Sequence, residues 1–316
     1  MSSINTNVAA NSALQALTMT QKEMVQTQAR ISTGYRVANA QDNAAYWSIA
    51  TTMRSDSGAL SAVKDALGLG SATADVAYTG VNNSIKLLDQ IKQKLVAARE
   101  PGVDRTKIQS DIKALQDQLQ STADTASFSG QNWLKIDSTA GTDIVKQVVS
   151  SFARDSSNAV TVGTISVTLY NATTGATVGL FDQNTTASAK VGLLDKQQTA
   201  ASGANYTVAT LDISALTDST ADLTDLDSYI TTVDSTISKL TGSATTLGSV
   251  KSRIDMQKSF VSDLMGAVDT GVSLLVDADM NEESTKLQAL QTKQSLGVQS
   301  LSIANQSSQA ILKLFQ

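Results

Sequence analysis

The sequence predicts a mainly α-helical protein: a long antiparallel helical bundle or coiled coil, with the terminal helices at one end and a small β-containing central insert. Three observations predict this fold class. Apolar residues recur at spacings of three and four over most of the chain outside its centre. Aromatic residues make up only 4% of the 316 residues. The single proline, Pro101, leaves little to interrupt helical hydrogen bonding.

Three helices are expected before the centre of the chain. The first carries an apolar stripe at helical spacing, with Gln21 and Gln28 on the same stripe. The second runs from Tyr46 to Leu95 and would be on the order of 75–80 Å long at about 1.5 Å per residue. It ends at residues 100–102, Glu-Pro-Gly, because proline cannot continue the hydrogen bonding and glycine permits a turn. A third helix follows, with Asp104 as its N-cap.

The centre of the chain, from Phe128 to about Thr220, is rich in Ser, Thr, Gly and Ala. Residues 160–170 alternate β-branched with small polar residues and predict a strand. Residues 171–175 carry a turn signal, after which 176–181 is expected to pair back as a hairpin. Residues 206–213 predict another strand. The centre is therefore expected to be a small β-containing insert.

Helical spacing returns at Leu226 and continues to Leu275, and a last helix is expected over roughly 283–315. A short and a long helix thus precede the insert, and a long and a short helix follow it. An antiparallel reversal would pair the two long helices and bring the termini to the same end. The expected domain boundaries are 1–44 and 277–316 for the terminal helices, 45–135 and 223–276 for the bundle, and 136–222 for the insert.

The terminal helices carry apolar stripes for which the rest of the chain offers no partner. Two short amphipathic helices that pair only with each other would be marginal, so copies of the same protein are the simplest source of further contacts. We therefore expect self-assembly through the apolar residues of these helices: Leu14, Leu17, Met24, Ile31, Leu287, Leu290, Val298, Leu301, Leu312 and Phe315.

Composition argues against several functional classes. Cysteine and histidine are absent, which removes thiol chemistry, the commonest general base and the commonest neutral metal ligand. The net charge of −5, without a basic cluster, argues against a nucleic-acid partner. The sequence contains no uninterrupted run of about 18 apolar residues, so no membrane span is predicted. The polar faces of the terminal helices are rich in Ser, Gln and Asn and carry few lysines, so protein partners are favoured over a membrane surface.

The N-terminal segment also bears on location. It lacks a charged region followed by a continuous apolar region, so no cleavable secretory signal is predicted. The protein is therefore expected either to be cytoplasmic or to leave the cell by a route that needs no such signal.

Local motifs give weaker signals. Residues 277–283 are rich in carboxylates, but an EF-hand requires glycine at the sixth position and glutamate at the twelfth, where Glu282 and Gln288 stand. An acidic start to the last helix is the simpler interpretation. Gly68-Leu-Gly70 resembles part of a phosphate loop within a helical pattern, and a close approach of another helix explains it better. Five Asn-x-Ser/Thr triplets begin at Asn82, Asn171, Asn184, Asn205 and Asn305, and such triplets are common by chance in a chain rich in Ser and Thr. O-linked sugar on the Ser/Thr-rich insert is more plausible than N-linked sugar at these triplets.

Two terminal segments resemble bacterial flagellins. Near the N-terminus these are INTNVAANSALQAL and, at 31–50, ISTGYRVANAQDNAAYWSIA; at the other end the segment is VDADMNEESTKLQALQTKQSLGVQSLSIANQSSQAILKLF. The resemblance covers roughly 1–135 and 226–316. Tyr46-Trp47 stands where a Gly-Leu pair is common in enteric flagellins, and this is similar to flagellins of rhizobia and related alphaproteobacteria, some of which build rigid filaments from several flagellins.

The resemblance implies a structural subunit of the flagellar filament, used in swimming motility. Flagellins are exported unfolded by a type III apparatus, with an export chaperone, and assemble beneath a distal cap. Hook-associated proteins are further partners, and other flagellins can co-assemble. The terminal helices form an inner tube, the long helices an outer one, and the insert faces solvent. The resemblance implies an extracellular location, in the bacterial flagellum.

One region departs from the flagellin pattern. In many flagellins, Arg and Glu stand at the positions of Gln90 and Gln93, flanking Lys92, and contribute to recognition by Toll-like receptor five. Because both charges are lost, the resemblance does not carry this recognition over to the chain.

Two alternatives to the filament subunit stay open. A hook–filament junction protein shares related terminal helices but would not extend into long filaments alone. An enzyme hosted in the insert is the alternative from another class. The absence of His and Cys, and of paired acidic residues at a plausible spacing, argues against it. We expect no enzymatic activity, no metal and no cofactor.

Overall fold

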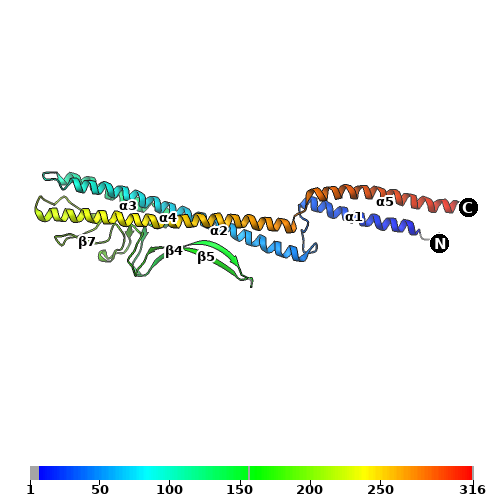
Figure 1. Ribbon diagram of the computed structural model, residues 1–316, viewed down its shortest axis with the longest axis horizontal. Coiled ribbons are helices and arrows are strands. Elements are labelled where there is room, and N and C mark those ends of the chain that lie inside the picture. Colours follow the sequence, from blue (N-terminus) through cyan, green and yellow to red (C-terminus); the bar gives the residue numbers. More distant parts are fainter. Residues whose placement is uncertain (1–6, 156, 315–316) are drawn as a thin grey trace. The chain divides into compact units, whose positions relative to one another are not determined.

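The computed structural model describes residues 7–155 and 157–314, and the side chains of residues 7–155 and 157–306. The described chain is mainly α-helical with a β-containing insert, as the sequence predicts (Figure 1). Its five helices are α1 (Val8–Thr33), α2 (Ala44–Ala97), α3 (Arg105–Thr125), α4 (Thr220–Val276) and α5 (Met280–Leu314). The chain divides into a terminal unit, Met1–Gly58 with Met265–Gln316, and a central unit, Ala59–Leu264.

Within the central unit, α2 and α4 bury one apolar seam each. Successive buried apolar residues on each helix are three, four or seven positions apart, as in a heptad repeat. On α2 they are Leu60, Val63, Leu67, Ala74, Ala77, Val81, Leu88, Ile91 and Leu95. On α4 they are Leu226, Tyr229, Val233, Leu240, Ala244, Leu247, Val250, Ile254 and Val261. The seams explain why helices of 54 and 57 residues form with so few aromatic residues.

Polar pairs beside the seam fix the register of these two helices. Lys64 Nζ donates to Ser262 Oγ at 3.2 Å, and Ser71 Oγ donates to Asp255 Oδ1 at 3.2 Å. Further along, Lys92 pairs with Asp234 and Arg99 with Asp227. The steps of seven residues from 64 to 71 on α2, and from 92 to 99 just past its end, are each matched by a retreat of seven on α4. The helices are therefore antiparallel.

Helix α3 begins where the sequence predicts. The Asp104 side chain caps it by accepting hydrogen bonds from the backbone N–H groups of Thr106 and Lys107. Arg105 is buried and donates to the carbonyl oxygens of Ala98 and Leu216, at 3.0 and 3.2 Å. It also pairs with Asp218 at 2.7 Å. One guanidinium thus joins the start of α3 to the end of α2 and to the segment before α4.

The insert contains two long strands, β4 (Ile144–Arg154) and β5 (Val160–Tyr170), which pair antiparallel. Its other strands have two residues each: β1 (Ser127–Phe128), β2 (Gln131–Asn132), β3 (Lys135–Ile136), β6 (Phe181–Asp182), β7 (Gln198–Thr199) and β8 (Asn205–Tyr206). Two 3-10 helices span Ala187–Ala189 and Val208–Thr210.

Two local predictions for the insert are wrong. The strand at 160–170 forms, but its partner is β4 rather than residues 176–181. After the turn only a Tyr170–Thr177 bridge remains, because Leu180 and Phe181 turn inward and Phe181 pairs with Lys135 of β3. The predicted strand at 206–213 is reduced to β8 followed by the 3-10 helix, because Leu211 and Ile213 are buried beside α3, where Gln109 holds the backbone of both residues.

Glycines on α2 admit the insert against the helix. A Cβ atom added at Gly70 would lie 2.4 Å from Val148 Cγ1, and one added at Gly80 would lie 2.5 Å from Leu134 Cδ1. A Cβ at Gly68 would meet nothing within 4 Å. The Gly68-Leu-Gly70 motif thus marks a close approach, but a strand of the insert makes it and not another helix.

A buried carboxylate organises the loops of the insert. Asp182 accepts hydrogen bonds from the backbone N–H groups of Ser138, Val191 and Asn184 and from the Ser138 hydroxyl. Burial alone would raise the pKa of Asp182, but these donors outweigh it and lower the pKa below its usual value. At Asp195, burial dominates and raises the pKa, although the carboxylate accepts from Asp182 N and Lys190 Nζ.

Candidate functional site

The terminal unit pairs α1 with α5, and polar contacts fix the direction of the pair. Asn7 Nδ2 donates to the Ala304 carbonyl at 3.0 Å. Gln294 Nε2 donates to Gln21 Oε1 at 2.8 Å. Since the partner number falls as the α1 number rises, the two helices are antiparallel. Gln21, a polar residue on the predicted apolar stripe, therefore contributes to the contact between the helices.

A charged pair lies near the other end of these helices. Arg30 Nη1 lies 3.0 Å from Glu283 Oε1. Glu283 is buried, and its other oxygen has no hydrogen-bond partner in the described part of the chain. Asp279 caps α5 by accepting from the N–H groups of Asn281 and Glu282. These acidic residues thus serve the start of a helix, in line with the simpler interpretation of the sequence.

The connecting segments of the terminal unit are held together through the backbone. The N–H groups of Arg36 and Val37 donate to the Val276 carbonyl at 2.7 and 3.1 Å, and Ala278 N donates to the Gly34 carbonyl at 2.8 Å. Gly34 has a φ of 75°, a left-handed conformation that ends α1. A small apolar core lies beside these bonds: Val37, Ala50, Val272 and Val276, with Met53, Val268 and Leu275 at its edge.

The pairing of α1 with α5 covers only part of the predicted apolar stripes. Met24 and Leu290 are buried. Four more residues are half-buried: Leu17, Ile31, Leu287 and Leu301. Leu14 and Val298 keep 50% and 54% of their surface exposed. The Leu312 side chain and Phe315 lie outside the described residues.

Several apolar residues of these helices were not singled out in the sequence and are more exposed than the stripes. They are Val8, Met19, Val25, Leu296 and Ile303, with Ile303 at 66% exposure. We call these residues, together with Leu14 and Val298, the uncovered face. A search for one stripe per helix misses Val8, Met19, Leu296 and Ile303, because they lie on other sides of the helices. Apolar residues on more than one side of a helix would have been the signal.

The three residues of the predicted receptor region lie on α2 in the central unit. Gln90 and Gln93 are exposed. Lys92 is half-buried and its ammonium pairs with Asp234 of α4. The only charged residue of the three is thus engaged within the chain.

The described residues show no group of three or more His, Cys, Asp or Glu side chains arranged to hold a metal ion. By length and composition alone, one helix among them could cross a membrane. Helix α4 contains an 18-residue window of mean hydropathy 1.3, of which 17% is buried. The sequence predicts no membrane span because it contains no uninterrupted apolar run of sufficient length. A window of high mean hydropathy can contain polar residues and so does not require such a run. A single such helix is weak evidence, because core helices of soluble proteins meet the same criterion.

Paired terminal helices with an uncovered apolar face are typical of a subunit that assembles with copies of itself. The family model of the bacterial flagellin N-terminal helical region matches residues 4–139, and that of the C-terminal helical region matches residues 230–315. The chain therefore belongs to the bacterial flagellin family.

Full-length relatives agree with this assignment. Flagellin C of Rhizobium meliloti (strain 1021) is 47% identical over 324 residues, Flagellin A of the same strain is 41% identical over 395 residues, and a flagellin of Brucella melitensis biotype 1 is 42% identical over 317 residues. Each alignment covers all of both chains. The protein is a structural subunit of the extracellular flagellar filament, which serves motility, and it assembles with copies of itself. These relatives offer no support for the hook–filament junction alternative.

Proposed function

We propose that the filament forms when the terminal helices of neighbouring copies bury the apolar residues that α1 and α5 leave uncovered. The contact residues would be the predicted stripe residues together with the uncovered face. The observation that carries this proposal is the exposure of Leu14, Val298 and Ile303 on a helix pair that has few buried residues of its own. Burying one such side chain contributes about 1.5–3 kcal/mol, and a polymer repeats this gain at every subunit.

The same proposal assigns roles to the segments predicted from the sequence. Residues 1–44 and 277–316 would line the inner part of the filament, 45–135 and 223–276 would form the layer around it, and 136–222 would face solvent. The helical resemblance at both ends, with 140–229 outside both family models, supports this division.

Seeded elongation tests the assembly role. Purified Leu14→Lys monomer is added to sheared filament seeds and examined by electron microscopy. Val160→Lys is the matched control, since Val160 of β5 is also 50% exposed but lies in the insert. We expect Val160→Lys to elongate seeds and Leu14→Lys to remain monomeric, with circular dichroism unchanged in both. Normal elongation by Leu14→Lys and by Leu301→Lys would refute the proposal.

We infer further that the chain reaches the filament by unfolded export, without removal of a leader. An export chaperone would keep the terminal helices from associating early, and a distal cap and hook-associated proteins would bound the polymer. Membership of the flagellin family supports this route, and so does a sequence without cysteine, which forms no disulfide that an unfolded chain would have to carry. Intact-mass measurement of filament subunits tests it: the mass should correspond to the full N-terminal segment, and the loss of about 20 residues would contradict it.

We also propose that the subunit has no catalytic activity. It contains no His and no Cys, and its family is a structural one. Hydrolase assays on purified filaments, with a denatured sample as blank, should give no turnover above that blank.

A further inference from the structure

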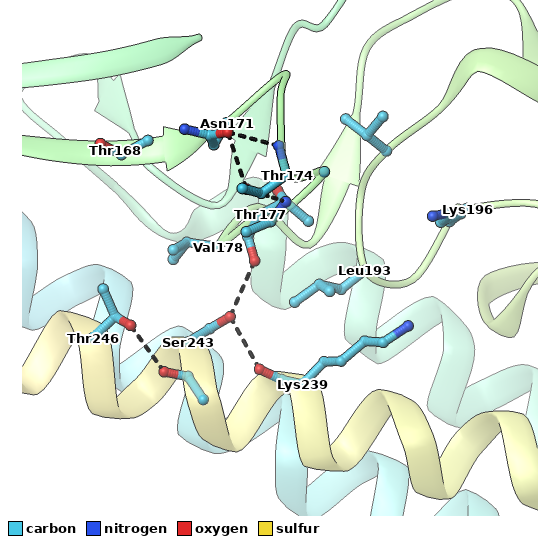
Figure 2. Close-up of a pocket in the computed structure, with 14 residues that line it drawn as sticks. Thr168, Asn171, Thr174, Thr177, Val178, Leu193, Lys196, Lys239, Ser243 and Thr246 are labelled. Carbon is cyan, nitrogen blue, oxygen red and sulfur yellow. Dashed lines mark hydrogen bonds between the residues drawn. The ribbon is translucent and has the colours of Figure 1, made fainter.

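The central unit contains a cavity of about 620 Å³ (Figure 2). Its walls come from the end of β5 and the following turn, from the segment between Val191 and Lys196, and from the face of α4 between Lys239 and Thr246. A second hollow of about 220 Å³ shares Leu193, Lys196 and Lys239 with it. Cavities of 300–1,000 Å³ are the usual size for small-molecule sites.

The two lysines that line this cavity are exposed, and no carboxylate in the described part of the chain pairs with them. Of the eleven other lysines of the central unit, seven pair with an aspartate: Lys92, Lys94, Lys107, Lys113, Lys135, Lys190 and Lys251. Lys196 and Lys239 have no carboxylate partner among the described residues, although the net charge of the chain is −5. Two ammonium groups at one cavity without a counter-charge favour an anion there.

The rest of the lining is rich in hydroxyl and amide groups. Thr168, Asn171, Thr174, Ser243 and Thr246 all line the cavity (Figure 2). Asn171 Oδ1 accepts from the backbone N–H and the hydroxyl of Thr174, at 2.8 and 2.9 Å. This fixes the side chain and leaves its NH₂ group as a donor. The Ser243 hydroxyl donates to the carbonyls of Thr177 and Lys239, at 3.3 and 3.2 Å, and so keeps its oxygen as an acceptor.

The kinds of residue that are missing narrow the ligand further. Among the lining residues there is no aromatic ring on which a base or an aromatic ligand could stack, and no arginine for two-point binding of phosphate. The ammonium group of lysine is a single point charge, and two such groups can bind one carboxylate without the bidentate geometry that arginine provides. Val178, Val191 and Leu193 supply a small apolar strip suited to the C–H groups of a saturated ring.

We propose that this cavity binds an acidic saccharide, with Lys196 and Lys239 at its carboxylate and the Asn171, Ser243 and Thr246 side chains at its hydroxyls. The site would give the insert a ligand-binding role in addition to its place in the filament subunit. Binding is non-covalent and requires no cofactor.

Titration of the full-length monomer tests the proposal. The probe is a trimer of galacturonic acid, followed by calorimetry, with a neutral galactose trimer and inorganic phosphate as comparison ligands. We expect saturable binding of the acidic trimer only, weakening as salt is raised. Equal binding of the neutral trimer, or phosphate binding as tight as that of the acidic trimer, would overturn the saccharide assignment, as would no saturable binding below about 10 mM, an affinity too weak for a formed site.

Two variants place the binding in this cavity. Lys196→Gln combined with Lys239→Gln should weaken binding at least about ten-fold, because two charge-assisted hydrogen bonds are lost. Lys86→Gln, at an exposed lysine of α2 outside the cavity, is the matched control and should bind as the wild type does.

Gly242→Tyr fills the cavity without removing charge. Gly242 lines the cavity, and a Cβ there meets nothing within 4 Å, so the helix should tolerate the side chain. Gly68→Tyr on α2 is its control, since Gly68 is equally open and lies outside the cavity lining. Unchanged binding in both the lysine double variant and Gly242→Tyr, with unfolding temperatures equal to the wild type, would show that the cavity is not the site.

Discussion

Arg30 of α1 and Glu283 of α5 form an ion pair of 3.0 Å in which the two partners differ in exposure. The Glu283 side chain is 8% exposed, whereas that of Arg30 is 31% exposed. The second Glu283 oxygen has no partner in the described structure. The carboxylate therefore depends on Arg30 more than the guanidinium depends on Glu283.

This asymmetry predicts unequal effects of removing each partner. Arg30→Ala leaves a buried carboxylate without its counter-charge and should destabilise the α1–α5 pairing by about 2 kcal/mol, less than for a fully buried pair because Arg30 is partly exposed. Glu283→Gln leaves no buried charge and should cost less. Amide hydrogen exchange across α1 and α5 measures both. A larger loss of protection in Glu283→Gln than in Arg30→Ala would contradict the prediction.

The close approach at Gly80 predicts that a single methyl group destabilises the insert. Gly80→Ala would place a Cβ atom 2.5 Å from Leu134 Cδ1, so Leu134 or the helix must shift. We expect a loss of about 1–3 kcal/mol in the free energy of unfolding. Gly68→Ala, with open space around it, should instead gain roughly 0.5–1 kcal/mol from helix propensity. Thermal unfolding of the two variants should shift in opposite directions.

The Asp182 network predicts a pH-dependent stability of the insert. Because the folded pKa of Asp182 is lowered, its contribution is present above the ordinary aspartate pKa and is lost as the pH falls through the folded value. Asp182→Asn should therefore cost about 1–3 kcal/mol at pH 7, and the difference from the wild type should shrink in acid. Denaturant unfolding between pH 3 and 7, a range about the ordinary aspartate value, measures this.

Asp143, a carboxylate that accepts one hydrogen bond, supplies the control for that experiment. The exposed Asp143 accepts one backbone hydrogen bond, from Ala172 N at 2.7 Å. Asp143→Asn disturbs this single bond and should have a small effect. A pH-independent effect of Asp182→Asn, of the same size as that of Asp143→Asn, would show that the network does not stabilise the insert.

The buried Arg105 predicts a large effect of losing one side chain at the start of α3. Arg105→Ala removes hydrogen bonds to the Ala98 and Leu216 carbonyls and the pair with Asp218, and should cost about 2–4 kcal/mol. Lysine cannot reproduce the fork geometry, so Arg105→Lys should restore only part of this. Arg99→Ala removes an exposed pair with Asp227 and should have a much smaller effect. Chemical denaturation that ranks Arg99→Ala above Arg105→Ala would contradict the prediction.

The helices were predictable because each repeats one physical pattern many times. Thirteen apolar positions at heptad spacing on α2 outweigh the glycines between them, and Asp104 marks the start of α3 by an ordinary capping bond. In the insert, the sequence signal for each strand comes from only a few residues. Long-range contacts decide between competing partners there, as the pairing of β5 with β4 shows.

The apolar residues of the terminal helices, through which assembly is proposed, were only partly predictable. The stripes that include Met24 on α1 and Leu290 on α5 could be predicted from spacing, and these two residues are buried. Val8, Met19 and Ile303 could not, because a stripe search assumes that each helix has one apolar side. A helix that contacts several neighbouring subunits needs more than one apolar side. The cavity at Lys196 and Lys239 left no local sequence signal, since its walls meet only after folding.

The seven-residue register between α2 and α4 has a mechanical consequence within the central unit. A rotating filament transmits torque through its subunits, and part of this torque acts as shear along their paired helices. Sliding one helix past the other would separate Lys64 from Ser262 and Arg99 from Asp227 in the same movement, and would expose the apolar seam. Both pairs depend on the same alignment of the two helices, so a displacement along the helix axis that breaks one pair also breaks the other. A slide along the seam would therefore break these pairs together rather than one after another.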